Sequence, residues 1–563
     1  MNTNNIQGIV PAVAPIWPEF DPTYPTLILA DSTYMVLQQL SYSVVSSLLS
    51  TRANITLIFA GGKITGSGTL VGNYTTIIAP PIQIFDSTIT FGGTWRQEKV
   101  YAENFDTILS MSSNAAPAIN KALQFSNVSG CRVILLGKTY NITQTIKILG
   151  NTTLEGTICG PSYTTDSDFS NIGTRIQTTG NALMIKIETD GNKLALYATV
   201  DCYRFVLRNL ALYTTGTGDV INIIATNNRI NNVDTNPGKI SPRHGILENL
   251  IIAHYHISVN ESIPGHSIKI SGGSYIRLER LAISGGQGIK LDNTFSYQEF
   301  IWMRQIALNT MNDVYPNPPS SIEINQGNNI YLNEIDVNDV QTGILLKTTS
   351  ANSIHDIVME RLAVVRCNKA LVFNAHAAYI GRIKLLDSTI YIKDTNGSMA
   401  LEFLRSGGFN ISDSVFDTIF IDKLGGSGHY TINDPNAGVV NCRFLNFRVP
   451  SDNSVLKCTL KVGNQNNELN FVNVKKSDTV TTSIISGLVY TINLAPFGMY
   501  TINSPFPDGA NPVAIVSTNQ KIPFKVTTTN TNGGTSQLHV EFASAPSGTV
   551  YISYHLTGFY YQQ

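Results

Sequence analysis

The chain carries few charged residues and has no long apolar run. Asp, Glu, Lys and Arg make up 14 % of its 563 residues, and the formal net charge is −1. Without a basic stripe, electrostatic capture of nucleic acid is unsupported. No segment has 18 uninterrupted apolar residues, so we expect no membrane insertion. The first basic residue is Arg52, preceded by Asp21 and Asp31, so we expect no signal peptide and, for an extracellular role, exit by lysis or on a particle.

Cysteine is sparse as well, and its spacing excludes the common metal and redox motifs. The six cysteines form no CxxC motif and no Cys/His ligand pair. We interpret them as small buried apolar residues and expect neither a metal site nor a cofactor. They are Cys131, Cys159, Cys202, Cys367, Cys442 and Cys458.

Short apolar strands recur through the middle of the chain. Each unit reads apolar-x-apolar, two mostly polar residues, then apolar-x-apolar, and Ile276–Ile283 is the clearest copy. Units begin at residues 276, 301, 330, 357, 383, 414 and 440, which are 25 to 31 residues apart. A repeat of this size is typical of a solenoid, whose units bury their apolar faces against their neighbours. Because the alternation has period two, we predict an all-β parallel β-helix.

The composition divides the chain into four predicted parts. Residues 1–54 read as a proline-rich extended arm followed by a helix over residues 29–50, and residues 55–100 as a β-rich neck. The β-helix is predicted over residues 101–475. After about residue 476 the repeat stops, and alternating runs between turn-rich spacers predict a β-sandwich over residues 476–563. Such a module would cover the last rung, whose open edge would otherwise invite aggregation.

The start of the predicted β-helix carries several local motifs. Residues 101–105 read Tyr-Ala-Glu-Asn-Phe, residues 114–127 have helical apolar spacing, residues 137–140 read Gly-Lys-Thr-Tyr, and residues 151–156 read Asn-Thr-Thr-Leu-Glu-Gly. This order resembles the pectate-lyase-like β-helix of bacteriophage tailspikes and related polysaccharide-active proteins. The chain departs from the family pattern at residues 106–110, Asp-Thr-Ile-Leu-Ser, where an Asp-rich segment is usual.

That resemblance implies a right-handed β-helix and a set of partners. Tailspike-like proteins are virion proteins of the phage tail that bind host-surface polysaccharide and act outside the cell. The resemblance implies a homotrimer held together by the C-terminal module, and an N-terminal arm that contacts tail or baseplate proteins. Nothing in the spacing of the residues bears on the trimer.

Two aromatic residues fall on equivalent outward positions of neighbouring repeats. Alternation places Arg277, Trp302 and Tyr331 on the outward side of the first strand, and stacked strands lie about 4.8 Å apart. Trp302 and Tyr331 would form an aromatic platform for the apolar face of a sugar, with Arg277 at its edge. The alternative is that the same rings pack against another chain of an oligomer or under a loop.

Carboxylates near this platform favour glycoside hydrolysis, in which one group protonates the leaving oxygen and a second activates water or attacks. Asp336 is the charged exception on an outward ladder of small residues, Glu334 lies in the adjacent bend, and Glu323 belongs to another strand of the same or a neighbouring rung. We predict the catalytic pair among these three residues, and we assign Glu299 and Asp313 to substrate binding. The alternative is that these carboxylates are merely solvated.

Four of the nine histidines fall within residues 241–266, together with Arg243 and Tyr255. A polysaccharide lyase needs a base beside a uronate carboxylate, with a cation or a tyrosine to assist, so this segment is the candidate lyase site. His254 and His256 have the period-two spacing that places both on one side of a strand. The alternative is a turn-lining or oligomer-facing role.

The sequence thus predicts a tailspike-like receptor-binding protein for host capsular or other surface polysaccharide. Its action stays open between a depolymerase, by hydrolysis or by elimination, a non-cleaving adhesin, and a structural tail-fibre component. A cellular β-helix enzyme is disfavoured by the lack of a signal peptide. Every site assignment depends on the rung register, since a one-residue slip turns each outward side chain inward.

Overall fold

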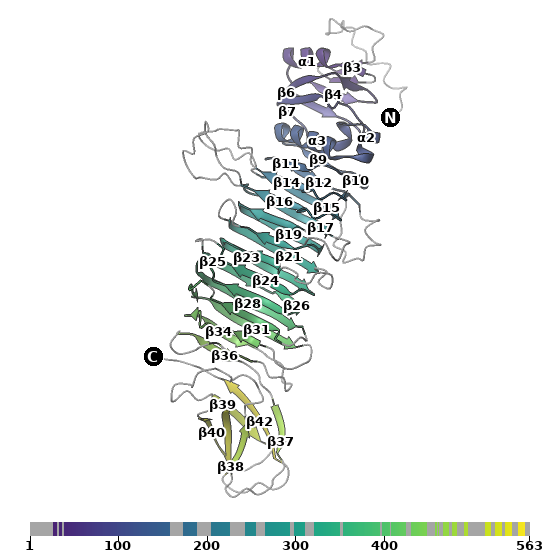
Figure 1. The fold of residues 1–563 in the computed structure, drawn as a ribbon. Coiled ribbons are helices and arrows are strands. Elements are labelled where there is room, and N and C mark those ends of the chain that lie inside the picture. Colours follow the sequence, from purple (N-terminus) through teal and green to yellow (C-terminus); the bar gives the residue numbers. More distant parts are fainter. Residues whose placement is uncertain are drawn as a thin grey trace. The chain divides into compact units, whose positions relative to one another are not determined.

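The computed structural model separates into two compact units, residues 1–286 and 287–563. Strands dominate both units, and in each they stack side by side (Figure 1). The residues that the structure describes are 26–30, 33–36, 39–157, 173–188, 204–225, 242–254, 265–292, 298–309, 320–349, 353–393, 397–405, 407–423, 430–447, 457–458, 460, 466–471, 476–480, 489–493, 513–518, 524–531, 535–542 and 550–557.

The first unit begins with a small, mostly parallel sheet. Its strands are β1 (Thr26–Ala30), β2 (Thr33–Val36), β4 (Thr56–Phe59), β6 (Gly68–Ile78) and β7 (Ile89–Trp95), paired in that order, and all pairs after β1–β2 are parallel. Parallel stacking therefore reaches into the predicted neck. Strand β3 (Gln39–Ser41) pairs in parallel with β5 (Lys63–Thr65).

The helix predicted over residues 29–50 is much shorter in the structure. Helix α1 spans Tyr42–Thr51, and strands occupy residues 26–30, 33–36 and 39–41 before it. The reason is visible in the burial pattern: Tyr34, Val36 and Leu40 are buried while the described residues next to them are not, which is the period of a strand. The apolar residues of this segment were compatible with both periods, and packing selected the strand.

Helix α3 (Ala116–Ser129) confirms the helix predicted over residues 114–127. It has proline in its first turn and is followed by Gly130, whose φ of 72° is the left-handed conformation that favours glycine at this position. Its Phe125 ring contacts the rings of Phe91, Trp95 and Phe105, so the helix covers the first turns of the solenoid with an aromatic cluster.

The rest of the first unit is a parallel β-helix with two walls. Strands β8 (Lys99–Tyr101), β9 (Arg132–Ile134), β12 (Thr153–Glu155), β15 (Val206–Thr214), β17 (Ile246–His254) and β19 (Gly273–Gly285) form one wall, which β10 (Thr139–Asn141) and β13 (Arg175–Thr178) join at β15. Strands β11 (Ile146–Ile148), β14 (Ile185–Glu188), β16 (Ile221–Ile224) and β18 (Ile268–Ser271) form the other. All of these pairs are parallel.

The second unit repeats the two-walled arrangement. Its first wall contains β21 (Gln298–Asn309), β23 (Gly327–Asn338), β25 (Ile354–Glu360), β26 (Ala363–Cys367), β28 (Ile380–Ile392), β30 (Ile411–Ser412), β31 (Val415–Lys423), β33 (Val439–Val440), β34 (Arg443–Phe447) and β36 (Glu468–Phe471). Its second wall contains β20 (Ile289–Leu291), β22 (Ser320–Ile324), β24 (Thr342–Lys347), β27 (Lys369–Asn374), β29 (Met399–Leu404), β32 (Tyr430–Asn433) and β35 (Lys457–Cys458). The predicted parallel β-helix is confirmed.

Nine described rungs of the first wall bend at two left-handed residues placed five positions apart. These residues have φ between 47° and 59°. Many are Asn or Asp, the residues other than Gly that adopt this conformation most readily. The pairs are Arg204/Asn209, His244/Asn249, Tyr275/Arg280, Phe300/Gln305, Asn329/Glu334, Asp356/Arg361, Arg382/Asp387, Asp413/Thr418 and Asn441/Asn446.

The bends explain the repeat seen in the sequence. Of the four residues between two bends, the first and third face the core, as Ile276 and Leu278 do with no exposed surface. The second and fourth face outward, and the second bend residue is the other polar position of the repeat. The predicted register is therefore confirmed for these positions, and with it the direction of their side chains.

Past β36 the described strands are antiparallel. Strands β37 (Lys476–Val480), β42 (Val550–Thr557) and β39 (Val513–Thr518) form one sheet, and β38 (Val489–Asn493), β41 (Thr535–Phe542) and β40 (Phe524–Thr531) form another. The change from parallel to antiparallel pairing falls where the sequence repeat stops. The four domain limits, the cap and its role in trimerisation stay predictions. Among the described residues, no helix is long and apolar enough to cross a membrane.

Candidate functional site

Strands β21 and β23 place Trp302 directly opposite Tyr331. The two rings are stacked, with 6.0 Å between their centroids and 8° between their planes. Tyr331 is 36 % exposed and Trp302 is half-buried. Phe300, the bend residue before Trp302, stacks on the indole at 6.2 Å and 26°. The register thus brings the two predicted aromatics together and adds a third ring that the sequence reasoning missed.

A polar column runs beside this aromatic column. Arg304 and Asn333 are the next outward residues of the same two strands, and they are opposite each other in register. The Glu334 carboxylate lies 4.0 Å from Nε of Arg304 and 3.2 Å from a terminal nitrogen of Arg361. Arg361 also donates to Asn333 at 2.8 Å, and Asn333 donates to Glu360 at 2.9 Å. Glu334 is therefore an ion-paired carboxylate.

Asp336 lies in a different environment, two residues beyond Glu334 and past the bend. In register it stands between Ala307 and Ala363, and it is half-buried. Burial raises the pKa of the Asp336 carboxyl, and a 2.8 Å hydrogen bond from Asn338 offsets part of this rise. Among the described residues no cation is paired with it. The two carboxyl groups thus have environments of opposite character, the usual basis for separate acid and base roles.

Glu323 stands on the other wall. It lies on β22, opposite Lys290 of β20, and the Lys290 Nζ is 3.3 Å from Oε1 of Glu323. The structure therefore splits the predicted catalytic trio: Glu334 and Asp336 share one strand, while Glu323 belongs to a different sheet and has a lysine partner of its own. Its catalytic role stays a prediction.

The predicted substrate-binding residues are also dispersed. Glu299 is half-buried on β21, opposite Asn328 of β23. Arg277 is exposed on β19 of the first unit, opposite Ile246 of β17, and its predicted place beside Trp302 stays a prediction. Asp313 lies outside the described residues.

Two histidines of the candidate lyase segment have partners within the fold. His254 is the last residue of β17, is 1 % exposed, and its Nε2 lies 2.9 Å from the carbonyl oxygen of Gly216. His266 Nδ1 lies 3.3 Å from Asp219. Burial alone would raise the pKa of Asp219, but its hydrogen bonds to His266 outweigh burial and lower it.

The other members of that segment give no convergent base. His244 is a bend residue whose ring stacks on Tyr275 at 4.8 Å and 5°. Tyr255 and His256 lie outside the described residues. The contacts of the three described histidines favour the turn-lining alternative over a lyase site. The described residues contain no group of three His, Cys, Asp or Glu side chains placed to hold a metal ion.

A second polar cluster on the first wall was not anticipated from the sequence. Arg382 donates to both carboxylate oxygens of Asp356 at 2.7 Å, and these hydrogen bonds lower the pKa of Asp356 to about 2. His355 Nδ1 lies 2.8 Å from Asp356, and the His355 ring stacks on the exposed Tyr379 at 6.2 Å and 6°. The sequence signal that could have predicted this cluster is the pair of Asp356 and Arg382, which occupy equivalent bend positions of successive rungs.

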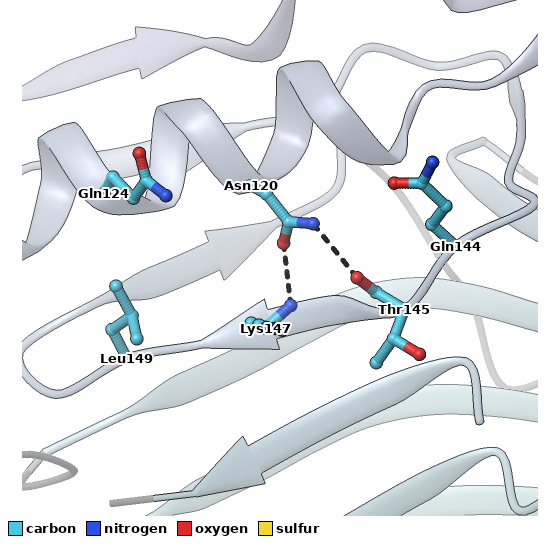
Figure 2. Close-up of a pocket in the computed structure, with 6 residues that line it drawn as sticks. All are labelled: Asn120, Gln124, Gln144, Thr145, Lys147 and Leu149. Atoms are coloured by element: carbon cyan, nitrogen blue, oxygen red, sulfur yellow. Dashed lines mark hydrogen bonds between the residues drawn. The ribbon is translucent and has the colours of Figure 1, made fainter. Parts of the chain in front are cut away.

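A pocket of about 330 Å³ lies in the first unit between α3 and β11. Figure 2 shows Asn120 of α3 directed at the strand, where it accepts a hydrogen bond from the Lys147 backbone N–H at 2.7 Å and donates to the Thr145 carbonyl at 3.0 Å. The amide thereby pairs with the backbone of β11, the first strand of its wall. Because the Asn120 amide at the centre of the pocket is already hydrogen-bonded to the backbone, the pocket is better explained by a structural role than by ligand binding. The lining residues are Asn120, Gln124, Gln144, Thr145, Lys147 and Leu149.

No protein-family model matches the chain, and a comparison with curated proteins gives no match. Among solved structures, the chain is similar to the A-module of the mannuronan C-5 epimerase AlgE6 of Azotobacter vinelandii, with 12 % identity, 65 % of this chain and 97 % of that chain covered, and a TM-score of 0.38. It is also similar to an exopolygalacturonase of Thermotoga maritima, with 9 % identity, 66 % of this chain and 90 % of that chain covered, and a TM-score of 0.38. For the tailspike gp61 of Pseudomonas phage phi297 the identity is 10 %, 79 % of this chain and 92 % of that chain are covered, and the TM-score is 0.34.

Likenesses this distant assign no activity to the chain. The class of protein is defined by its own strands: parallel pairing in two walls, a regular pair of bends per rung, and an outward face on which aromatic and charged side chains form separate columns. It is a parallel β-helix protein, the fold expected from the sequence.

Proposed function

We propose that this chain is a tailspike-like receptor-binding protein that binds host-surface polysaccharide along the first wall of its second unit. The observation that carries the proposal is the stacked pair of Trp302 and Tyr331 on an exposed sheet face. The apolar face of a sugar packs well on an aromatic ring, and rings on successive rungs offer contacts to successive parts of an extended glycan.

The surroundings of the pair support the same function. The strands that carry the two rings are hydrogen-bonded to each other and bounded by regular bends, so little conformational entropy is lost on binding. Arg304, Asn333 and Glu334 supply donors and acceptors beside the rings, which is the mixture of apolar surface and directed polar groups that sugar sites need.

Alanine substitution of the rings tests the proposal. Trp302→Ala and Tyr331→Ala should each weaken binding about tenfold, the equivalent of about 1.4 kcal/mol of lost stacking. Affinity electrophoresis in gels that contain purified capsular polysaccharides of candidate hosts measures the change. Phe420→Ala is the matched control, because Phe420 is another exposed aromatic of the same unit that lies outside the pair. Unchanged retention of Trp302→Ala would contradict the proposal.

In this proposal the protein acts outside the cell as part of a phage virion. Residues 1–54 attach it to tail or baseplate proteins, and residues 476–563 hold three chains together. Light scattering of the full chain checks the oligomer: a particle of three times 61.4 kDa supports it, and a particle of 61.4 kDa contradicts it.

A second candidate function is hydrolysis of the bound glycan, which the environment of Asp336 favours. A half-buried carboxyl group with a raised pKa retains its proton longer than a solvated one and can donate it to a leaving oxygen. Glu334, two residues away, is the partner carboxylate on the same strand, and it is ion-paired with Arg361 at 3.2 Å.

Digestion of candidate polysaccharides, followed by size-exclusion chromatography with ultraviolet detection, separates the modes of action. Shortened chains without new absorbance indicate hydrolysis, and Asp336→Asn should then slow cleavage at least about 100-fold. Asp339→Asn is the matched control, because Asp339 is paired with Arg366 at the following bend. New absorbance near ~235 nm would indicate elimination at a uronate. Retention without shortening would leave a non-cleaving adhesin.

A further inference from the structure

Arg304 makes weaker contacts with carboxylates than the neighbouring arginines of the outward face do. Its side chain is 59 % exposed, and its Nε lies 4.0 Å from the Glu334 carboxylate, which is beyond hydrogen-bond distance. Arg304 shows no other charged contact among the residues that the structure describes. Its guanidinium therefore presents donors to the solvent at the edge of the aromatic pair.

The neighbouring arginines have their donors occupied. Arg361 is 3.2 Å from Glu334 and 2.8 Å from the Asn333 side-chain oxygen. Arg366 is paired with both oxygens of Asp339, and Arg382 with both oxygens of Asp356. Since these arginines are comparably exposed, exposure alone does not explain the difference. What separates Arg304 is the absence of a hydrogen-bonded carboxylate partner in the described part of the chain.

The position of Arg304 relative to the rings is set by the strand. Arg304 follows Trp302 by two residues with no bend between them, so both side chains leave the same face of β21 about 7 Å apart. A sugar ring stacked on Trp302 and Tyr331 would direct a substituent from its edge toward this guanidinium. The planar fork of arginine suits a carboxylate better than it suits a lone hydroxyl.

We infer that this face selects an acidic polysaccharide, with the sugar ring on Trp302 and Tyr331 and its carboxylate bound by Arg304. The inference rests on the proposed function and names the substrate class of that same site. It replaces Arg277, which the sequence placed at the edge of the platform, with a residue of the same strand as Trp302.

Short-range contact, not a long-range field, is the basis of this selection. The charged residues of β21 and β23 are Glu299, Arg304, Glu334 and Asp336. Because positive charge does not predominate on these strands, a polyanion gains nothing from general attraction. Its carboxylate gains only where it meets donors that are not already satisfied, as at Arg304.

The test compares each acidic glycan with the same glycan after its carboxyl groups have been reduced to alcohols. The probes are purified bacterial capsular polysaccharides that contain uronic acid, each beside its carboxyl-reduced form, and retention of the full-length protein is measured. We expect the acidic form to bind about 10- to 100-fold more tightly, the range of a charge-assisted hydrogen-bonded pair.

Variants of the chain separate the contribution of Arg304 from that of the rings. Arg304→Gln should weaken binding of the acidic form much more than binding of the reduced form, so that the preference for the acidic form is lost. Arg366→Gln, which removes an arginine already paired with Asp339, is the matched control and should change neither. Glu334→Gln should strengthen binding of the acidic form, because it removes the carboxylate that competes for Arg304. If Arg304 had only a structural role, Glu334→Gln would not strengthen binding of the acidic form.

The outcomes distinguish this inference from the proposed function. Equal binding of acidic and reduced forms, weakened by Trp302→Ala, would overturn the acidic specificity and leave polysaccharide binding in place. Preference for the acidic form that survives Arg304→Gln would overturn the role of Arg304. Failure of the wild-type protein to bind any glycan of either form would overturn the inference together with the proposed function.

Discussion

The hydroxyl of Tyr140 donates a 2.7 Å hydrogen bond to the carboxylate of Glu103, a residue that is 2 % exposed. Lys138 Nζ lies 2.7 Å from the same oxygen. Burial and then the charge of Glu103 raise the pKa of Tyr140, so its hydroxyl stays a donor at any physiological pH. The two motifs at the start of the β-helix, residues 101–105 and 137–140, are therefore halves of one buried polar network.

Removal of the Glu103 charge should destabilise the start of the solenoid. Glu103→Gln leaves Lys138 without its counterion and should lower the free energy of unfolding by about 2 kcal/mol, less than for a fully buried pair because Lys138 is partly exposed. Tyr140→Phe, which removes a single hydrogen bond, should cost about 1 kcal/mol. Chemical denaturation measures both. Equal stability of Glu103→Gln and wild type would show that the network contributes nothing.

The side chain of Asn120 should protect the edge of strand β11. Asn120→Ala leaves the Lys147 N–H and the Thr145 carbonyl without their partner, at a cost of about 1–2 kcal/mol, and exposes an edge that can pair with another chain. Thermal unfolding and light scattering should show a lower midpoint and more aggregation. Gln124→Ala, on the same helix and in the same pocket, is the control and should leave both unchanged.

The stability effect of Asp336 should depend on pH in a defined direction. Because its pKa is raised in the folded protein, the folded state binds this proton more tightly than the unfolded state, and stability falls as pH rises from 3.8 through the folded pKa. Asp336→Asn should therefore raise the unfolding midpoint at neutral pH and lose this advantage well below pH 3.8. If Asp336→Asn were instead less stable than wild type at neutral pH, the fold would stabilise the ionised form of Asp336. That result would argue against Asp336 as a proton donor.

Asp356 should show the opposite dependence. Its pKa is lowered to about 2 by hydrogen bonds from Arg382, so its contribution to stability is complete above pH 3.8 and is lost as pH falls toward about 2. Arg382→Gln should lose less stability than wild type as the pH falls across this window. Thermal unfolding at a series of pH values measures the loss in both proteins. The same slope in both proteins would show that the pair does not couple to folding.

The three thiols that are buried among the described residues should be inert in the native protein. Burial raises the pKa of Cys131 to about 11 and the pKa of Cys367 and Cys442 to about 12, so their reactive thiolate forms are scarce near neutral pH. Alkylation followed by peptide mapping should find them unmodified before denaturation and modified after it. Rapid alkylation of any of them in the native state would show that its rung opens.

Much of the β-helix could be predicted because its repeat is a local property. Alternation of apolar and polar residues identified Ile276 and Leu278 as inward, and equal positions in successive repeats placed Trp302 opposite Tyr331. The helix predicted over residues 29–50 was longer than the observed Tyr42–Thr51, because apolar residues of both periods overlap there and only packing distinguishes them. The weak pairing of Arg304 was also missed, since the 4.0 Å between Arg304 and Glu334 is a distance between two rungs.

The sequence by itself determined the rungs, their register and the direction of each side chain on the wall, because strand alternation acts between adjacent residues. The tertiary structure decided which charges meet. It joined Glu323 to Lys290 on one wall, placed Glu334 between Arg304 and Arg361 on the other, and left Asp336 between two alanines. These contacts join side chains of different rungs, and alternation along one strand does not specify which charged side chains of neighbouring rungs come within reach of each other.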